Sequence, residues 1–299
     1  MDGILIIDKP DGLTSHDVVA RVRRILKTKR VGHTGTLDPF ATGVLVLLVG
    51  QATRLAQFLD KNEKEYEALV RLGFETDTGD KTGSPKSEVQ SPKSVSLPEI
   101  EKVLGKFRGE IEQVPPMYSA KKIEGRKLYE LAREGQEVKR AAVKINIREL
   151  ELNTIPTQSD LGLGTWDLGL HVVCSAGTYI RTLAEDIGKR LGVGAHLQEL
   201  RRTRAGKFDL PRSITIEQLE SLDNPSSAFI PMPEAVSHLP KLILPAARVE
   251  KTRNGLASRS TETWPSNQPI RMLDESNNLI AVGIYDEAEN TVRPKIVLV

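Results

Sequence analysis

An unbroken run of valine and leucine at residues 44–49 constrains the fold of this chain more than any other sequence feature. Such runs are typical of strands that are buried on both faces, because a strand with one solvated face alternates apolar and polar residues. The run is far shorter than the ~20 apolar residues that a membrane helix needs. It therefore predicts a strand in the interior of a globular protein.

Predicted strands and helices alternate around this run, and several are joined by turns of hairpin length, which favours an α+β sheet over a repeated βαβ array. A strand at 4–7 precedes a Pro-Asp-Gly turn, and Thr14 or Ser15 then caps an amphipathic helix that ends near Lys29. Residues 76–95 predict a long exposed loop. Further strands are predicted at 66–72, 142–152 and 166–174, and further helices at 52–59, 97–107, 127–134 and 178–191.

The pattern changes after residue 233, where short apolar runs are separated by Gly, Asn, Ser and Asp. These runs predict strands at 242–244, 270–272, 279–282 and 296–298. A boundary near Pro240 therefore divides the chain into a large domain, 1–239, and a small β-rich module, 240–299.

Composition narrows the classes of function. Apolar residues make up 39% of the chain and charged residues 27%, as in a globular protein. The single cysteine, Cys174, permits no intramolecular disulfide, and the five histidines show no His-Glu-x-x-His spacing, so no metal site is predicted. The N-terminus lacks the features of a signal peptide, and we expect a cytoplasmic protein.

The net charge is only +2, but the basic residues are unevenly distributed. Three clusters, at 21–30, 121–127 and 201–207, contain several lysines or arginines each. Such clusters on a nearly neutral chain indicate patches that face a polyanion. The alternative is that each cluster is a solvated helix face, which is common for any one of them.

A glycine-rich loop ends in Asp38 and leads into the apolar run. Gly32 and Gly35 allow backbone geometries that other residues avoid, and Pro39 restricts Asp38 to extended conformations. No Gly-Lys-Ser/Thr follows, which excludes a phosphate-binding Walker loop. A carboxylate in so rigid a turn is well placed to act on a substrate. From spacing alone, however, an aspartate that satisfies the amides of its own turn is the more common explanation.

Several motifs in the sequence occur in a fixed order. They are Asp8-Lys9-Pro10 with Thr14-Ser15; Gly32-His33-Thr34-Gly35-Thr36-Leu37-Asp38-Pro39; Tyr66 with Thr76-Asp77-Thr78-Gly79-Asp80; Val114-Pro115-Pro116-Met117-Tyr118-Ser119; and Gly177-Thr178-Tyr179-Ile180-Arg181, extended by Leu200-Arg201-Arg202. Through these motifs the chain resembles the TruB family of tRNA pseudouridine synthases, from the N-terminus to about Arg204. The tail is similar, more weakly, to the PUA-like module of bacterial members.

The resemblance implies a pseudouridine synthase fold, with a central mixed, largely antiparallel sheet flanked by helices, and an enzyme without a cofactor that isomerises uridine 55 in the T arm of tRNA. Asp38 is then the catalytic carboxylate, acting on the base, on the sugar or on a ribose proton. Tyr66 is expected to stack on the flipped uracil and Arg181 to pair with Asp38. The remaining substrate-binding residues implied are His33, which helps flipping, with Tyr179 and Leu200 in the pocket wall.

The resemblance also implies how RNA is held. A thumb-like insertion at about 115–135 closes on the RNA arm, and the module at 240–299 binds RNA. We expect tRNA to be the partner of this chain, and we expect no contact with a membrane, no guide RNA and no obligate protein partner. We also expect the chain to be a monomer. The implied phosphate contacts are Arg21, Arg24, Lys121, Lys122, Arg126, Lys127, Arg201 and Arg202.

Two alternatives share the same sequence features. One is an RNA-binding or RNA-folding protein on the same scaffold, which can coexist with catalysis. The other is the relative that works inside guide-RNA ribonucleoproteins, against which the insertion at 115–135 argues. The chain departs from a minimal family member in the segments 84–96 and 154–165.

Overall fold

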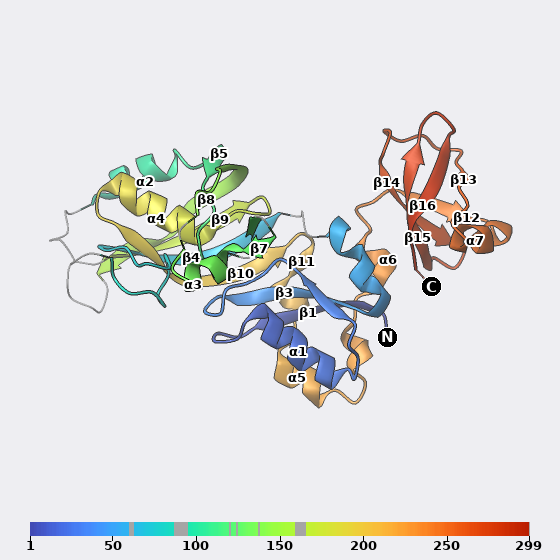
Figure 1. Cartoon of the computed structure of the whole chain (residues 1–299), viewed down its shortest axis with the longest axis horizontal. Helices are drawn as coiled ribbons and strands as arrows, with labels where there is room; N and C mark the ends of the chain where they lie inside the picture. The colour runs from blue at the N-terminus through green and yellow to red at the C-terminus, as the bar shows by residue number, and fades with distance from the viewer. Residues whose placement is uncertain are drawn as a thin grey trace.

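A nine-stranded mixed sheet forms the centre of the molecule (Figure 1). The computed structural model describes residues 1–59, 63–86, 95–119, 121–123, 125–136, 138–158 and 166–298. Seven strands follow the order β1-β3-β10-β4-β9-β8-β5, while β2 pairs with β3 and β11 with β10. These strands are β1 (Gly3–Lys9), β2 (Val31–Thr34), β3 (Thr42–Val49), β4 (Lys64–Leu72), β5 (Gly109–Gln113), β8 (Val143–Gln158), β9 (Trp166–Cys174), β10 (Ala195–Ala205) and β11 (Phe208–Asp209). Within the described sheet only β10 and β3 run parallel, so the predicted α+β fold with a largely antiparallel mixed sheet is confirmed.

Strand β3 lies between two clusters of buried side chains. Leu45 and Leu47 belong to the cluster that the helices α1, α2, α4 and α5 cover, whereas Val44 and Val46 belong to a second cluster on the opposite face. All four side chains are fully buried, which confirms the prediction of a strand covered on both faces. The elements involved are α1 (Ser15–Ile25), α2 (Leu97–Leu104), α4 (Ile180–Leu191), α5 (Ile216–Ser221) and, in the second cluster, the 3-10 helix η1 (Gly50–Phe58).

A five-stranded sheet forms the C-terminal end of the molecule (Figure 1). Its order is β12-β14-β15-β16-β13, and Leu273, Val282 and Ile296 belong to the second cluster, which also contains Ala52 and Leu55 of η1. The four predicted C-terminal strands correspond to β12, β14, β15 and β16, whereas α7 was not predicted. These elements are β12 (Lys241–Leu244), α7 (Ala246–Arg253), β13 (Ser258–Arg259), β14 (Pro269–Asp274), β15 (Leu279–Asp286) and β16 (Thr291–Val297).

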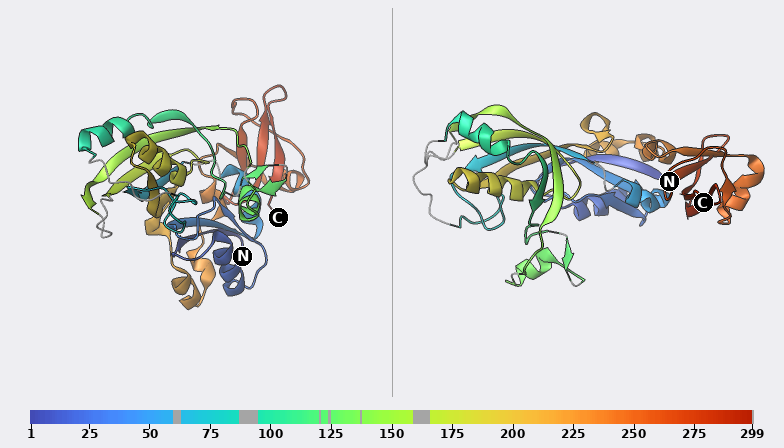
Figure 2. Two further views of the ribbon diagram at one scale, coloured as in Figure 1. Left: turned by 60° about the vertical axis from the view of Figure 1, so that its left-hand side comes forward. Right: turned by 90° about the horizontal axis from the view of Figure 1, so that it is seen from above.

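A hairpin and a short helix project from the body as an arm (Figure 2). The arm contains β6 (Lys122–Ile123), β7 (Arg126–Lys127) and α3 (Leu128–Arg133), so it coincides with the insertion expected at 115–135. The other described helices are the short η2 (Leu210–Arg212), η3 (Pro225–Ala228) and α6 (Met232–Ala235). None of the described helices is both long and apolar enough to cross a membrane.

Some local predictions were wrong. Strand β10 was missed because its three arginines hide the alternation of apolar and charged residues. The segment 76–86 is not a simple exposed loop, since Thr76 and Asp80 are buried and Asp80 forms a bridge with Leu197 of β10. Residues 87–94 and 159–165, which include most of the two segments that depart from the family pattern, lie outside the described residues.

Candidate active site

The loop that joins β2 to β3 carries Asp38, and two side chains hold it. The hydroxyl of Ser15, at the start of α1, accepts from the Leu37 N–H at 2.9 Å and donates to the Leu37 carbonyl at 3.1 Å. The buried ammonium of Lys9 donates to the Pro39 carbonyl at 2.9 Å and to two carbonyls of its own turn. The backbone on both sides of Asp38 is therefore fixed.

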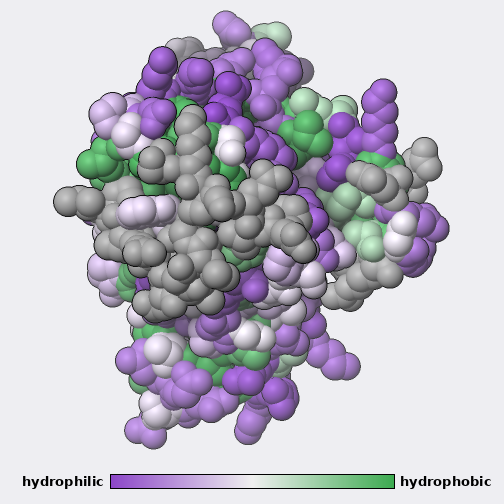
Figure 3. Space-filling model, turned by 90° about the vertical axis from the view of Figure 1, so that its left-hand side faces the viewer, coloured by the Kyte–Doolittle hydropathy of each residue, from purple (hydrophilic) through white to green (hydrophobic). Residues whose placement is uncertain are grey.

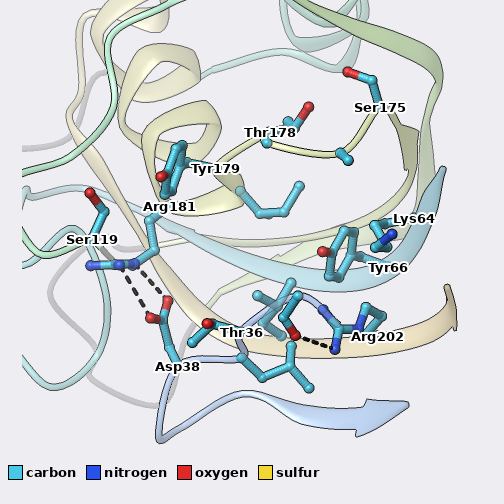
Figure 4. Close-up of a pocket in the computed structure, with 16 residues that line it drawn as sticks. Thr36, Asp38, Lys64, Tyr66, Ser119, Ser175, Thr178, Tyr179, Arg181 and Arg202 are labelled. Atoms are coloured by element: carbon cyan, nitrogen blue, oxygen red, sulfur yellow. Dashed lines mark hydrogen bonds and ion pairs between the residues drawn. The ribbon is translucent and has the colours of Figure 1, made fainter. Parts of the chain in front are cut away.

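The carboxylate of Asp38 faces the guanidinium of Arg181 (Figure 4). Nε of Arg181 lies 2.9 Å from Oδ2 of Asp38, and Nη2 lies 3.3 Å from Oδ1, so the pair is bidentate. The side chain of Asp38 is 33% exposed, whereas that of Arg181 is 6% exposed. The ion pair expected from the resemblance is present, and its carboxylate keeps one open side.

Other groups hold Arg181 from behind. Its Nη1 donates to the Thr78 carbonyl at 3.0 Å, and its Nη2 donates to the Tyr118 carbonyl at 2.6 Å. Nη1 also lies 3.6 Å from Oδ2 of Asp80, which is buried in the segment after β4. Arg181 therefore lies between two carboxylates and has little freedom to move away from Asp38.

The start of α4 is fixed by a buried side-chain amide. Gln113, at the end of β5, donates from Nε2 to the Tyr179 carbonyl at 3.0 Å and accepts from the Tyr179 N–H at 2.8 Å. Tyr179 directly precedes α4, and its own side chain forms no capping hydrogen bond. The amide therefore satisfies backbone groups at the helix N-terminus and places Arg181 in the first turn.

Burial raises the pKa of the Asp38 carboxyl above the ordinary aspartate value, because a charge is costly where water is excluded. The positive charge of Arg181 opposes this rise in pKa, and the negative charge of Asp80 adds to it. The protonation of Asp38 is therefore set by burial and by the charge of Asp80, which both raise its pKa, against the charge of Arg181, which lowers it.

A pocket of about 260 Å³ opens beside the ion pair. Its lining brings together five of the six residues to which the resemblance gives a catalytic or substrate-binding role, namely Asp38, Tyr66, Tyr179, Arg181 and Leu200, and Figure 4 labels all of these but Leu200. They come from the β2–β3 loop, from β4, from the start of α4 and from β10. The volume lies near the lower end of the roughly 300–1,000 Å³ range of ligand pockets, so the pocket suits one nucleotide rather than a stem.

His33 lies on β2, outside the residues that line this pocket. Its ring meets that of His16 edge-to-face, with 5.4 Å between the centroids. Burial lowers the pKa of His33 to about 4, helped by the charges of His16 and Arg202. His33 is therefore neutral near pH 7, which suits a contact with RNA rather than proton transfer.

One predicted phosphate contact is placed differently from the expectation. Arg202 is 1% exposed and lines the floor of the pocket, so the interpretation of the cluster at 201–207 as one outer patch is wrong. Successive side chains of a strand point to opposite faces of the sheet, so the side chains of Arg201 and Arg202 cannot lie on the same face. Arg201 lies on the outer face and pairs with Asp8 at 2.7 Å.

The other predicted phosphate contacts lie on α1 and on the arm. Arg24 is exposed on α1, Arg21 and Lys121 are half-buried, and Arg126 forms an exposed ion pair with Glu134. The side chains of Lys122 and Lys127 lie outside the described residues. Seen from the end that carries α2 and α4, hydrophilic residues cover most of the surface open to view, with scattered hydrophobic patches (Figure 3).

Four residues of the site had not been assigned a role from the sequence. Asp80 and Gln113 stand in quoted motifs or next to them, but only the fold brings them to Arg181 and Tyr179. Ser15 was predicted only as a helix cap, although its hydroxyl holds the loop. Lys64, which is buried at the start of β4, lines the pocket beside Tyr66. What marks these four residues is a polar side chain involved in the site after folding. A single sequence does not show which polar side chains the fold will bury.

The described residues contain no group of three or more His, Cys, Asp or Glu side chains that could hold a metal ion. The polar groups of the pocket are instead one carboxylate, cationic side chains, and hydroxyls from Tyr66, Ser119 and the turn before α4. Ser119 contributes a buried hydroxyl that has no hydrogen-bond partner in the described structure. These groups can orient a polar base and stabilise charge on it.

Two family models match consecutive parts of the chain. Residues 23–180 match the model described as TruB family pseudouridylate synthase (N terminal domain). Residues 181–249 match the model described as tRNA pseudouridylate synthase B C-terminal domain. The second match begins at Arg181, inside α4, and extends past the predicted boundary near Pro240.

Curated relatives match almost the whole chain. A tRNA pseudouridine synthase B of Solibacter usitatus is 43% identical over 288 residues, which cover 95% of both chains. That of Bacillus subtilis is 40% identical over 289 residues, which cover 94% of this chain and 92% of the relative. Among solved structures, a chain of a Cbf5-Nop10-Gar1 complex has a TM-score of 0.74 at 29% identity, with 99% of this chain and 85% of that chain covered. A chain of an H/ACA RNP bound to a substrate RNA containing 2'-deoxyuridine has a TM-score of 0.72 at 27% identity, with the same coverage.

Proposed function

The chain belongs to the TruB family of pseudouridylate synthases, and from this membership we propose that it isomerises uridine 55 in the T arm of tRNA to pseudouridine. It is an isomerase of the tRNA pseudouridine synthase class. The finer proposal is that Asp38 is the catalytic carboxylate and that no cofactor takes part. The bidentate Asp38–Arg181 pair at the edge of the pocket is the observation that carries it.

The reaction breaks the bond between ribose C1′ and uracil N1 and forms a bond between C1′ and C5. The C5 hydrogen leaves and N1 gains a proton, so the isomerisation needs no oxidant or phosphate donor. Asp38 supplies the carboxylate for the first step, by attack on the base or the ribose or by removal of a ribose proton. Arg181 favours its ionised form and fixes its orientation, as each of these steps requires.

The pocket accepts a base only after that base has left its stack. Tyr66 is 8% exposed in the pocket wall, where its ring can replace part of the lost stacking. Leu200 and Tyr179 form further parts of the wall. Neutral His33 lies outside the lining and assists flipping from there. We propose that nucleotide selection therefore comes from the fit of the flipped base and from the shape of the RNA loop.

The arm at 115–135 and the module at 240–299 are the proposed RNA-binding parts outside the catalytic domain, 1–239. Curated relatives that match about 95% of the chain carry the name tRNA pseudouridine synthase B, which supports tRNA as substrate. We propose that the chain acts as a monomer in the cytoplasm without guide RNA or an obligate protein partner. Exposed lysines and arginines contact phosphates and position the RNA.

Pseudouridine mapping in a T-arm transcript incubated with the purified chain alone tests the proposal. Wild type should convert the target uridine without added guide RNA, and Asp38→Asn should abolish conversion while it retains RNA binding. The matched control is Asp167→Asn, which removes a carboxylate from the Arg71 pair elsewhere in the sheet and should leave conversion unchanged. Full activity of Asp38→Asn would refute the assignment, and conversion only with guide RNA would refute independent action.

A further inference from the structure

Arg202 is a buried cation without a matching anion in the described residues. It is 1% exposed, and its guanidinium donates to backbone carbonyls rather than to a carboxylate. Burial of an unpaired charge is costly, and an apolar side chain of similar size at such a position often gives a protein of equal or higher stability. Stability therefore does not account for the arginine at this position.

Its partners are the first residue of the loop that carries Asp38 and a residue of β3, the strand that follows this loop. Nε donates to the Val44 carbonyl at 2.7 Å, and Nη2 donates to the Gly35 carbonyl at 3.2 Å. The backbone of Arg202 also pairs with Gly43, which has φ +97°, and a Cβ at Gly43 would lie 2.2 Å from the Arg202 carbonyl oxygen. The loop is thus pinned on both sides of Asp38 to a single residue of β10.

The same residue is tied to the aromatic wall of the pocket. Arg202 is the direct cross-strand neighbour of Tyr66 in the β10–β4 pair. Burial raises the pKa of Tyr66, and the positive charge of Arg202 opposes this rise. One guanidinium therefore connects the loop of the acid to the ring expected to stack on the base (Figure 4).

We propose that Arg202 is a positioning residue, which sets the placement of the Asp38 carboxylate relative to the Tyr66 ring. This role rests on the proposed function, because the spacing matters only if the acid and the ring act on one base. A misplacement of about 1 Å between reacting groups lowers a rate by about a hundredfold, so a link of this kind has a large kinetic effect.

Amide hydrogen exchange tests the structural part without reference to activity. Arg202→Met removes the donors without leaving a buried carboxylate unpaired, and we expect it to fold with an unchanged or higher Tm. The Leu37 amide donates to the Ser15 hydroxyl of α1, and the Ala41 amide donates to the Asp38 carbonyl. Exchange at both amides should become about tenfold faster or more. Arg71→Gln, which breaks an ion pair with Asp167 on the same sheet, should leave these two amides protected.

Single-turnover kinetics test the functional part. The rate of pseudouridine formation by Arg202→Met should fall about a hundredfold, while the Kd for RNA stays within about threefold of wild type. Arg202→Lys, which keeps a charge but cannot reach both carbonyls in a fork, should restore only part of the rate. The Arg71→Gln control should retain the wild-type rate.

Two results would overturn the proposal. One is wild-type protection of the Leu37 and Ala41 amides in Arg202→Met. The other is a loss confined to RNA affinity with a weaker salt dependence, which would make Arg202 a phosphate contact. Absence of pseudouridine formation by wild type would instead refute the proposed function, and hydrogen exchange would still decide the role of Arg202 in the loop.

Discussion

Arg181 lies between Asp38 and Asp80, with its Nε 2.9 Å from one carboxylate and its Nη1 3.6 Å from the other. The two carboxylates differ in their exposure and in their contacts with the Arg181 guanidinium. Asp38 opens onto the pocket and receives a bidentate contact, whereas Asp80 is buried and accepts further hydrogen bonds from Thr78 and Thr82. Asp80 therefore helps to hold the guanidinium, which in turn orients the Asp38 carboxylate at the pocket.

The pH dependence of the reaction should report the protonation of Asp38. Burial raises the pKa of this carboxyl, so it gains a proton at a higher pH than an ordinary aspartate, whose pKa is about 3.9. The single-turnover rate should therefore fall on acidification before that pH is reached. Because Asp80 raises the pKa of Asp38, Asp80→Asn should move the midpoint of this loss to lower pH. A midpoint that does not move would contradict the assigned coupling.

Loss of the guanidinium should change the same profile in the opposite direction. Arg181 lowers the pKa of Asp38, so Arg181→Gln should move the acidic midpoint to higher pH. It should also lower the rate at its plateau by about two to three orders of magnitude, because the carboxylate loses its bidentate partner. Rate-pH profiles under single-turnover conditions measure both effects. Arg190→Gln, at the end of α4, is the matched control and should leave the profile unchanged.

The contribution of Tyr66 to the reaction rate should come from its aromatic ring more than from its hydroxyl. Tyr66→Phe keeps a stacking surface, and we expect a rate within about tenfold of wild type. Tyr66→Ala should lose about 1–3 kcal/mol of base stacking, measured as weaker binding of a flipped base or a slower reaction. It should also lower the free energy of unfolding by about 3–5 kcal/mol, since the side chain is buried. Equal activity of the two variants would contradict a stacking role.

Gln113 should stabilise the start of α4, the helix that carries Arg181. Gln113→Ala leaves the Tyr179 N–H without a partner, whereas the Tyr179 carbonyl keeps the bond from the Leu183 N–H. The expected cost is about 1–3 kcal/mol in unfolding free energy. Chemical denaturation measures this cost. The control is Gln218→Ala, which removes an exposed amide from the capping box of α5 and should cost less. An equal cost for both variants would show that burial of the Gln113 amide adds nothing.

The sequence predicted those parts of the fold that depend on local pattern. The run at 44–49 became a strand covered on both faces. Of the two predicted caps, Thr14 is the one that caps α1, through a capping box with Asp17. Strand β10 was missed because charged residues at consecutive positions conceal a period of two. Only the pairing of β10 with β3 and β4 shows that Arg202 faces the pocket while Arg201 faces outward.

The sequence predicted only those site residues that stand in a recognisable local motif. Asp38 stands in a stiff, glycine-flanked loop, and the family resemblance identified it together with Tyr66 and Arg181. Asp80 and Gln113 act through contacts with partners 101 and 66 positions away along the chain, respectively, by the difference of their residue numbers. Such contacts depend on the completed sheet, and a local pattern in one sequence does not contain them.

The C-terminal sheet and the central sheet contribute side chains to one buried cluster, to which η1 and α6 also belong. Leu273, Val282 and Ile296 share one buried cluster with Ile6 of β1 and Val46 of β3. Removal of either unit therefore exposes apolar side chains of the other that are buried in the whole chain. We expect a single cooperative thermal transition for the whole chain, and a catalytic part cut at residue 240 should aggregate rather than work as an independent enzyme.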